Sequence, residues 1–259
     1  MKGLIIKDLM CLRKQRIIFI YTVVATVVLS VMFVLSARYG NIHAGTMQMV
    51  AEKQLNGVDV KNMGTMALVV FMILPIALVG DAATVFVYDG KAGFANVCAT
   101  LPLSINRRVM AKFITVIMMF GIGVSIDLVI SFVLSVLTDI ITFSEFLGII
   151  ISTASVMGIY GSITIFYCFC LGYGKESYAQ ILSIFSMVAA FILINFSSVK
   201  KIITDMSTPE TGENDLTYFT EILDFIKFRF YILFGIAVLV MIAAYFGTVI
   251  VAKRKRGMI

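Results

Sequence analysis

The sequence predicts an all-α polytopic membrane protein, with residues 1–259 forming a single transmembrane domain. The chain is 60% hydrophobic and 14% charged, whereas a soluble domain is close to half apolar and a quarter charged. Its apolar residues gather into six runs of about 18 or more, each long enough to cross a core of about 30 Å as a helix. The six predicted spans are 17–37, 64–87, 113–137, 146–171, 178–196 and 230–251. No segment approaches the size of a soluble domain, so a catalytic domain would have to come from another chain.

The first 16 residues predict an interfacial helix that leads into the membrane. They carry five basic residues against the single acid Asp8. Ile5, Leu9 and Leu12 recur at helical spacing, which suits a helix lying on the membrane surface. The apolar run 17–37 exceeds the usual signal-peptide core of roughly 7–15 residues, so we interpret it as an uncleaved first span.

The polar connections predict the orientation of the chain. Of the 21 Lys and Arg residues, 14 fall on the side that holds both termini. The positive-inside rule therefore places both termini in the cytosol. The segment 197–227 then faces outward, and its apolar residues at helical spacing predict a helix on the outer surface before the last span. The net charge of +6 is attributed to topology and contact with anionic lipid rather than to nucleic acid.

The segment 88–112 between the second and third spans predicts a short amphipathic helix. Its apolar face consists of Phe94, Val97, Cys98 and Leu101. This face could dock to a soluble partner or lie on lipid headgroups, and periodicity alone leaves both interpretations open.

Turn and capping signals set the limits of this segment. Asp89-Gly90 is a turn signal, and Pro102 ends the short helix because proline lacks an N–H. Ser104 or Asn106 can cap the next helix, which is expected to start at Arg107 and to run into the membrane.

Two aspartates, Asp81 and Asp127, are the acidic residues within the predicted spans. A charged Asp at the centre of a helix costs about 2.5–3.5 kcal/mol on insertion scales, so each should face protein or water. Asp81 lies near the inner end of its span, within reach of a basic partner such as Lys112 or Arg108. Asp127 continues as Ser131 and Ser135 at every fourth residue. This face could line a substrate route, or it could be a packing seam with a hydrogen-bonded Asp.

Other short patterns predict structure rather than chemistry. Ala154, Gly158 and Ser162 form the small-residue stripe of closely packed membrane helices. Gly172-Tyr-Gly-Lys175 lacks the spacing and the Ser or Thr of a Walker A loop, and no protease or hydrolase motif is present. The single histidine, His43, leaves no His-based metal site. The four cysteines suggest free thiols rather than a disulfide framework.

The order of these parts resembles the membrane subunit of bacterial ABC-2 type transporters. The resemblance rests on the basic N-terminal helix starting Met-Lys-Gly-Leu-Ile-Ile-Lys-Asp-Leu, on the six spans, and on the segment Leu101-Pro-Leu-Ser104 to Arg107, Arg108, Val109 and Lys112. It covers the layout of the whole chain. The size is similar to that of small drug and peptide exporters, including those for cytolytic peptides.

The resemblance implies a function and a set of docking residues. Segment 88–112 would be the coupling helix that rests on a separate ABC ATPase, and residues 1–16 the connecting helix. The chain would be the permease of an exporter in a bacterial cytoplasmic membrane, and its substrate an amphipathic or hydrophobic peptide, drug or lipid. It would not be an enzyme by itself, and the partner ATPase would bind ATP and Mg. The expected docking residues are Asp89, Lys91, Phe94, Asn96, Val97, Cys98, Leu101, Pro102, Arg107 and Arg108.

The assembly implied is two permeases, as a homodimer or as a pair with a second permease, above two ATPases. The competing function is a proton- or cation-coupled secondary transporter that uses the intramembrane aspartates. That class predicts inverted repeats and unwound midplane helices. The sequence shows no internal repeat, and among the spans only the second is interrupted by a proline, Pro75.

Overall fold

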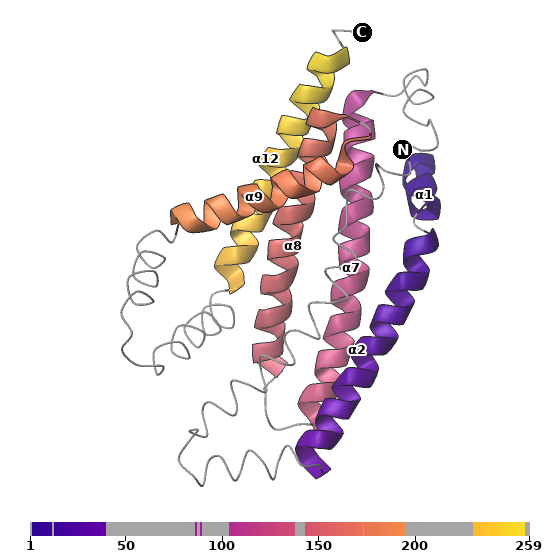
Figure 1. The fold of residues 1–259 in the computed structure, drawn as a ribbon, viewed down its shortest axis with the longest axis vertical. Helices are drawn as coiled ribbons and strands as arrows, with labels where there is room; N and C mark the ends of the chain where they lie inside the picture. Colours follow the sequence, from indigo (N-terminus) through magenta and orange to yellow (C-terminus); the bar gives the residue numbers. More distant parts are fainter. Residues whose placement is uncertain are drawn as a thin grey trace.

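The computed structural model describes residues 2–11, 13–39, 86, 89, 104–137, 143–172, 174–194 and 230–256. All regular structure in these residues is α-helix, which confirms the predicted fold class. The helices are α1 (Lys2–Cys11), α2 (Arg13–Tyr39), α7 (Ile105–Leu137), α8 (Phe143–Leu171), α9 (Glu176–Ile194) and α12 (Phe230–Arg256). In Figure 1, α2, α7, α8 and α12 run along the molecule, and α1 lies at the same end as the last turns of α12.

Three of the described helices are long and apolar enough to cross a membrane. They are Ile105–Val136, Phe143–Leu171 and Phe230–Arg254, which cover three of the six predicted spans. The second predicted span, apart from Phe86, and the outer segment 197–227 lie outside the described residues. The six-span count therefore stays a prediction.

Helix α1 lies within the predicted interfacial segment 1–16, and residues 13–16 of that segment begin α2. Helix α9 occupies most of the predicted fifth span, yet Figure 1 shows it crossing α8 rather than running beside it. The fifth span is thus still a prediction.

Helix α7 begins at a serine cap. The backbone carbonyl of Ser104 accepts hydrogen bonds from the N–H groups of Arg107 at 3.1 Å and Arg108 at 3.3 Å. Serine is favoured at this position because its side chain can satisfy free N–H groups of the first turn. Ser104 is therefore the cap among the two predicted candidates, and the helix starts at Ile105, before the predicted Arg107.

A tight turn joins α8 to α9 and explains the two glycines there. Gly172 and Gly174 have φ angles of 88° and 87°, a region that side chains with a Cβ rarely adopt. The N–H of Gly172 donates to the Cys168 carbonyl at 2.9 Å and closes α8. The N–H of Gly174 donates to Glu176 Oε1 at 2.8 Å. The glycines of this stretch therefore have a structural role.

Helix α8 is the centre of the described bundle, since it packs against α7, α9 and, most extensively, α12. The close approach to α12 occurs at Gly247, where an added Cβ would lie 3.1 Å from the Phe166 ring. At Gly158, in the predicted small-residue stripe, an added Cβ would meet nothing within 4 Å. Gly247, which the predicted stripe did not include, thus makes a closer contact than Gly158, which it did.

Two apolar clusters hold the helices together. The larger joins Phe86 to α7, α8, α9 and α12, and the smaller joins the far end of α7 to the start of α8. The larger cluster contains Phe86, Val109, Phe113, Val116, Ile165, Cys168, Ala179 and Val249; the smaller contains Leu134, Phe146 and Ile150.

Candidate functional site

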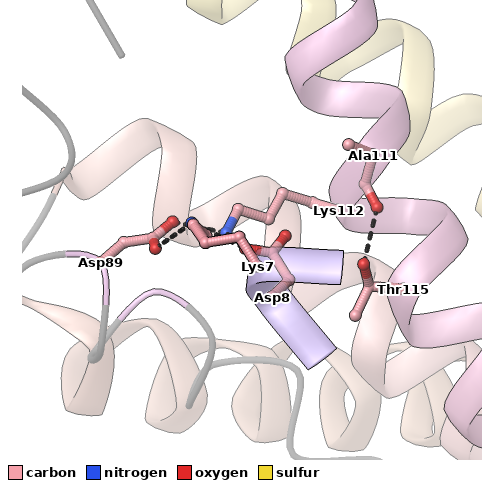
Figure 2. A network of polar contacts seen from close by, with 6 residues as sticks. All are labelled: Lys7, Asp8, Asp89, Ala111, Lys112 and Thr115. Atoms are coloured by element: carbon pink, nitrogen blue, oxygen red, sulfur yellow. Dashed lines mark hydrogen bonds and ion pairs between the residues drawn. The ribbon is translucent and has the colours of Figure 1, made fainter. Parts of the chain in front are cut away.

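Four charged side chains from three separate parts of the chain meet at the α1 end of the bundle (Figure 2). Lys7 and Asp8 come from α1, Lys112 from the third turn of α7, and Asp89 from a helical residue between them in sequence. Lys112 Nζ lies 2.5 Å from Asp89 Oδ2 and 3.0 Å from Asp8 Oδ1. Lys7 Nζ lies 2.5 Å from Asp89 Oδ1 and 2.7 Å from Asp8 Oδ1. We call these four residues the ion-pair cluster.

Three of the four side chains in the ion-pair cluster are buried, and the charges of its four members balance. The side chains of Asp8 and Asp89 are 1% and 3% exposed, and that of Lys112 is 10% exposed. Two positive and two negative groups alternate, so each carboxylate accepts from both ammonium groups. Such mutual pairing is required because removing a charge from water is costly unless an opposite charge and hydrogen bonds replace the lost hydration.

Lys7 is the most exposed member, with 23% of its side chain accessible. Burial lowers the pKa of Lys7, but its hydrogen bonds to Asp8 and Asp89 and their negative charges raise it more. The net result is a pKa above the usual 10.5. Lys7 therefore stays charged at neutral pH, as the balance of the cluster requires.

An aromatic ring forms one wall of the ion-pair cluster. Lys112 Nζ lies 5.3 Å from the centroid of the Phe86 ring, within the range of a cation–π contact. Phe86 in turn meets Phe169 of α8 edge to face, with 5.3 Å between ring centroids. The cluster thus sits directly against the larger apolar core, which excludes water from its inner side.

The arrangement fastens α1, the residue Asp89 and the first turns of α7 to one another. The bond between Lys7 and Asp89 joins residues 82 apart in sequence, and that between Lys112 and Asp8 joins residues 104 apart. A displacement of any one of these three parts must either carry the other two with it or break a buried ion pair.

The structure describes three of the ten predicted docking residues. Asp89 is helical, although a turn was predicted to start there, and its carboxylate is buried in the ion-pair cluster. Arg107 is exposed and Arg108 is half-buried in the first turn of α7. The other predicted docking residues lie outside the described residues: Lys91, Phe94, Asn96, Val97, Cys98, Leu101 and Pro102.

Sequence reasoning missed Lys7 and Asp8 as site residues, and it expected a different role for Lys112. Lys112 was considered as a partner for Asp81, which lies outside the described residues, whereas its carboxylate partners in the structure are Asp8 and Asp89. Asp8 stood out in the sequence as the one acid among five basic residues. That isolation is the signal that could have suggested a buried role.

The predicted polar face of α7 is present but closed. Asp127 and Ser131 are each 0% exposed, and Ser135 is half-buried. Ser131 Oγ donates to the backbone carbonyl of Asp127 at 2.6 Å, and Ser135 Oγ donates to that of Phe132 at 2.9 Å. Neither carboxylate oxygen of Asp127 has a hydrogen-bond partner. The hydroxyls therefore satisfy the helix backbone, and the Asp127 carboxylate is left without a hydrogen bond.

Within the described part of the chain, no three His, Cys, Asp or Glu side chains come together as a metal site would require. The described residues offer charged groups and helix contacts as their functional features. These features are one neutral ion-pair cluster that couples helices and one isolated carboxylate in the membrane-spanning part of α7.

A comparison with known protein families identifies the family of the chain. The family model for ABC-2 family transporter proteins matches residues 57–253, about three quarters of the chain. No curated protein and no solved structure matches the chain. The matched range includes Asp89, Lys112 and Asp127, whereas Lys7 and Asp8 precede it, so the ion-pair cluster joins the matched range to the N-terminal helix. With its membrane-spanning helices and this match, the chain belongs to the ABC-2 transporter family.

Proposed function

We propose that this chain is the permease subunit of an ATP-driven exporter and that a separate ABC ATPase supplies the energy. Membership of the ABC-2 family supports a membrane permease, and permeases of this family normally work with an ABC ATPase subunit. In the proposal the chain itself hydrolyses no ATP, and ATP and Mg bind to the partner. Both termini and segment 88–112 face that partner in the cytosol of a bacterial cell.

The ion-pair cluster is the observation that carries the coupling role. Asp89 lies at the start of the proposed coupling segment 88–112, and Lys112 lies at its end. Between Ile105 and Leu137 the chain is one uninterrupted helix, α7. A force applied to segment 88–112 would therefore pass directly into a membrane-spanning helix.

The ion-pair cluster also connects segment 88–112 to α1, which gives a second path for transmitting movement. Lys7 and Asp8 fix α1 to the same cluster. Helix α1 is followed closely by α2, and α2 packs against α7. In the proposed cycle, closure of the ATPases moves segment 88–112, and α1, α2 and α7 respond together to open the permease outward.

The complete transporter in this proposal contains two permeases and two ATPases, with six spans in each permease. The cargo is an amphipathic or hydrophobic peptide, drug or lipid. The two permeases are two copies of this chain.

Co-purification tests the proposal directly. The chain is co-expressed with candidate ABC ATPases, beginning with any encoded beside its gene, and the complex is purified and assayed for ATP hydrolysis. Phe94→Asp, which places a charge on the apolar face of the coupling segment, should abolish the complex while insertion into the membrane is retained. Phe143→Asp makes the same change at the exposed start of α8 and should leave the complex intact.

Two results would count against the proposal in different ways. Unchanged co-purification of Phe94→Asp would show that segment 88–112 is not the docking element. A wild-type chain that binds none of the ATPases, and that moves ions in liposomes along a proton gradient, would replace the permease with a secondary transporter.

A further inference from the structure

The carboxylate of Asp127 is isolated inside the bundle. The residue is 0% exposed, and neither Oδ1 nor Oδ2 has a hydrogen-bond partner. The nearest hydroxyl along the helix, that of Ser131, donates to the backbone carbonyl of Asp127. A buried carboxylate that is not hydrogen-bonded is uncommon, because its desolvation is compensated by nothing in the protein.

The predicted spans contain no basic residue that could serve as a counter-charge for Asp127. None of the six predicted spans contains Lys, Arg or His, and the one histidine, His43, lies in the first connection. The basic residue that precedes Asp127 most closely is Lys112, 15 residues earlier or roughly 22 Å along a helix at about 1.5 Å per residue. Lys112 is also already paired with Asp8 and Asp89. A second copy of this chain would bring the same spans and therefore no cation either.

A second buried polar group without a partner lies on a neighbouring helix. Ser30 of α2 is 2% exposed and its Oγ makes no hydrogen bond. Helix α2 packs against α7, and Figure 1 shows the two side by side. One turn earlier, Thr26 Oγ1 donates to the carbonyl of Thr22, a bond that Ser30 does not make to its own helix.

We propose that Asp127 is the anchor for a positively charged group on the transported substrate, an organic cation with an apolar body. This inference rests on the proposed function, since it names the substrate class of the same permease. The cation would supply the counter-charge that the spans lack, and the apolar body would suit the surrounding helices. An inorganic cation fits less well, because such ions need several oxygen ligands and the described residues gather no group of three potential ligands.

The Asp127 carboxylate is closed to solvent in this structure. Because Asp127 is 0% exposed, a ligand reaches it only after the residues packed around its carboxylate move apart.

Binding of a defined lipophilic cation tests this assignment on the full chain. Radiolabelled tetraphenylphosphonium is titrated against the purified chain in nanodiscs of uncharged lipid, with protein-free nanodiscs as the blank. We expect saturable binding that Asp127→Asn weakens at least tenfold and that Asp127→Glu retains. Asp139→Asn, which removes a carboxylate from the connection after α7, should bind as the wild type does. Tetraphenylborate, an anion of the same shape, should not compete.

Carbodiimide labelling provides a readout that needs no variant. Dicyclohexylcarbodiimide modifies carboxyl groups in apolar surroundings, and mass spectrometry locates the modified peptide. Tetraphenylphosphonium should protect Asp127 from modification, and tetraphenylborate should not. If Asp127→Asn fails to fold, this measurement on the wild-type chain still tests whether the cation binds at Asp127.

Three outcomes would overturn the cation site: no saturable binding above the blank, equal affinity of the wild type and Asp127→Asn, or equal protection by both ions. These outcomes are separate from failure of the proposed function. A chain that forms an active complex with an ATPase but ignores tetraphenylphosphonium is a permease without this site. A chain that binds the cation through Asp127 but binds no ATPase retains the site and loses the proposed exporter.

Discussion

Asp89 and Lys112 form a buried ion pair with 2.5 Å between Oδ2 and Nζ, although 23 residues separate them in sequence. The pair closes the two ends of segment 88–112 onto each other. The Phe86 ring lies beside Lys112, and α1 contributes Lys7 and Asp8. Because these four charged side chains pair with one another, we expect substitutions of Lys112 and Asp89 to affect stability in a coupled way.

Replacing Lys112 by Met should destabilise the fold strongly. Of the cations in the ion-pair cluster, the change leaves only Lys7 beside the buried Asp8 and Asp89, and breaking a buried pair in this way costs about 3–5 kcal/mol. Thermal unfolding of the purified chain in detergent, followed by size-exclusion chromatography, measures the loss. The matched control is Lys175→Met, which removes an exposed lysine from the α8–α9 turn and should have little effect.

The double variant Asp89→Asn with Lys112→Met should be more stable than Lys112→Met alone. It restores neutrality, because Lys7 and Asp8 remain as a pair. Coupled residues of one network show such non-additivity in double-mutant cycles. If the losses of stability in the two single variants simply added in the double variant, Asp89 and Lys112 would act independently. The ion-pair cluster would then not behave as one network.

Gly247 and Gly158 should respond in opposite ways to the same small side chain. An added Cβ at Gly247 lies 3.1 Å from the Phe166 ring, so Gly247→Ala should lower the unfolding temperature, and Gly247→Val should lower it further. At Gly158 an added Cβ meets nothing within 4 Å, and Ala favours a helix over Gly by about 1 kcal/mol. Gly158→Ala should therefore be neutral or stabilising; equal losses at both sites would contradict the packing of α12 on α8.

The sequence was sufficient for those features of the fold that depend on local chemistry. Helix α8 ends at Leu171, where an apolar run of the sequence also ends. Ser104 was one of two predicted caps. The choice between it and Asn106 needed the backbone, since both are good capping residues.

The residues that form the candidate site could be identified only from the tertiary structure. Lys112 has its partners 23 and 104 residues away, and periodicity along one helix carries no information about such distances. Asp127 was interpreted either as a lining residue or as a hydrogen-bonded packing residue. The structure buries its carboxylate without a hydrogen-bond partner, and the sequence alone could not show this because burial depends on tertiary packing.

Hydrogen bonds across the α8–α9 interface should contribute modestly to stability. Thr164 Oγ1 donates to Ser183 Oγ at 3.0 Å, and both residues are 0% exposed. Interhelical hydrogen bonds in membrane proteins average about 0.6 kcal/mol, because the separated helices also find partners. The cycle of Thr164→Val, Ser183→Ala and the double variant should give a coupling energy of about that size. A coupling of zero would indicate that this hydrogen bond does not help to hold α9 on α8.

The contribution of Lys7 should depend on pH only in the strongly alkaline range. The pKa of Lys7 is raised above 10.5, because its bonds to Asp8 and Asp89 outweigh the effect of burial. A raised folded-state pKa gives a stabilisation that is complete below the unfolded-state pKa and is lost as the pH rises through the folded-state value. The difference in unfolding temperature between the wild type and Lys7→Met should thus stay constant from about pH 7 to about pH 10 and shrink above that. The comparison with Lys7→Met removes the effects of the other lysines and tyrosines, which titrate in both proteins. A difference that already shrinks near pH 8 would mean that burial dominates at Lys7 and that its bonds to Asp8 and Asp89 do not hold in solution.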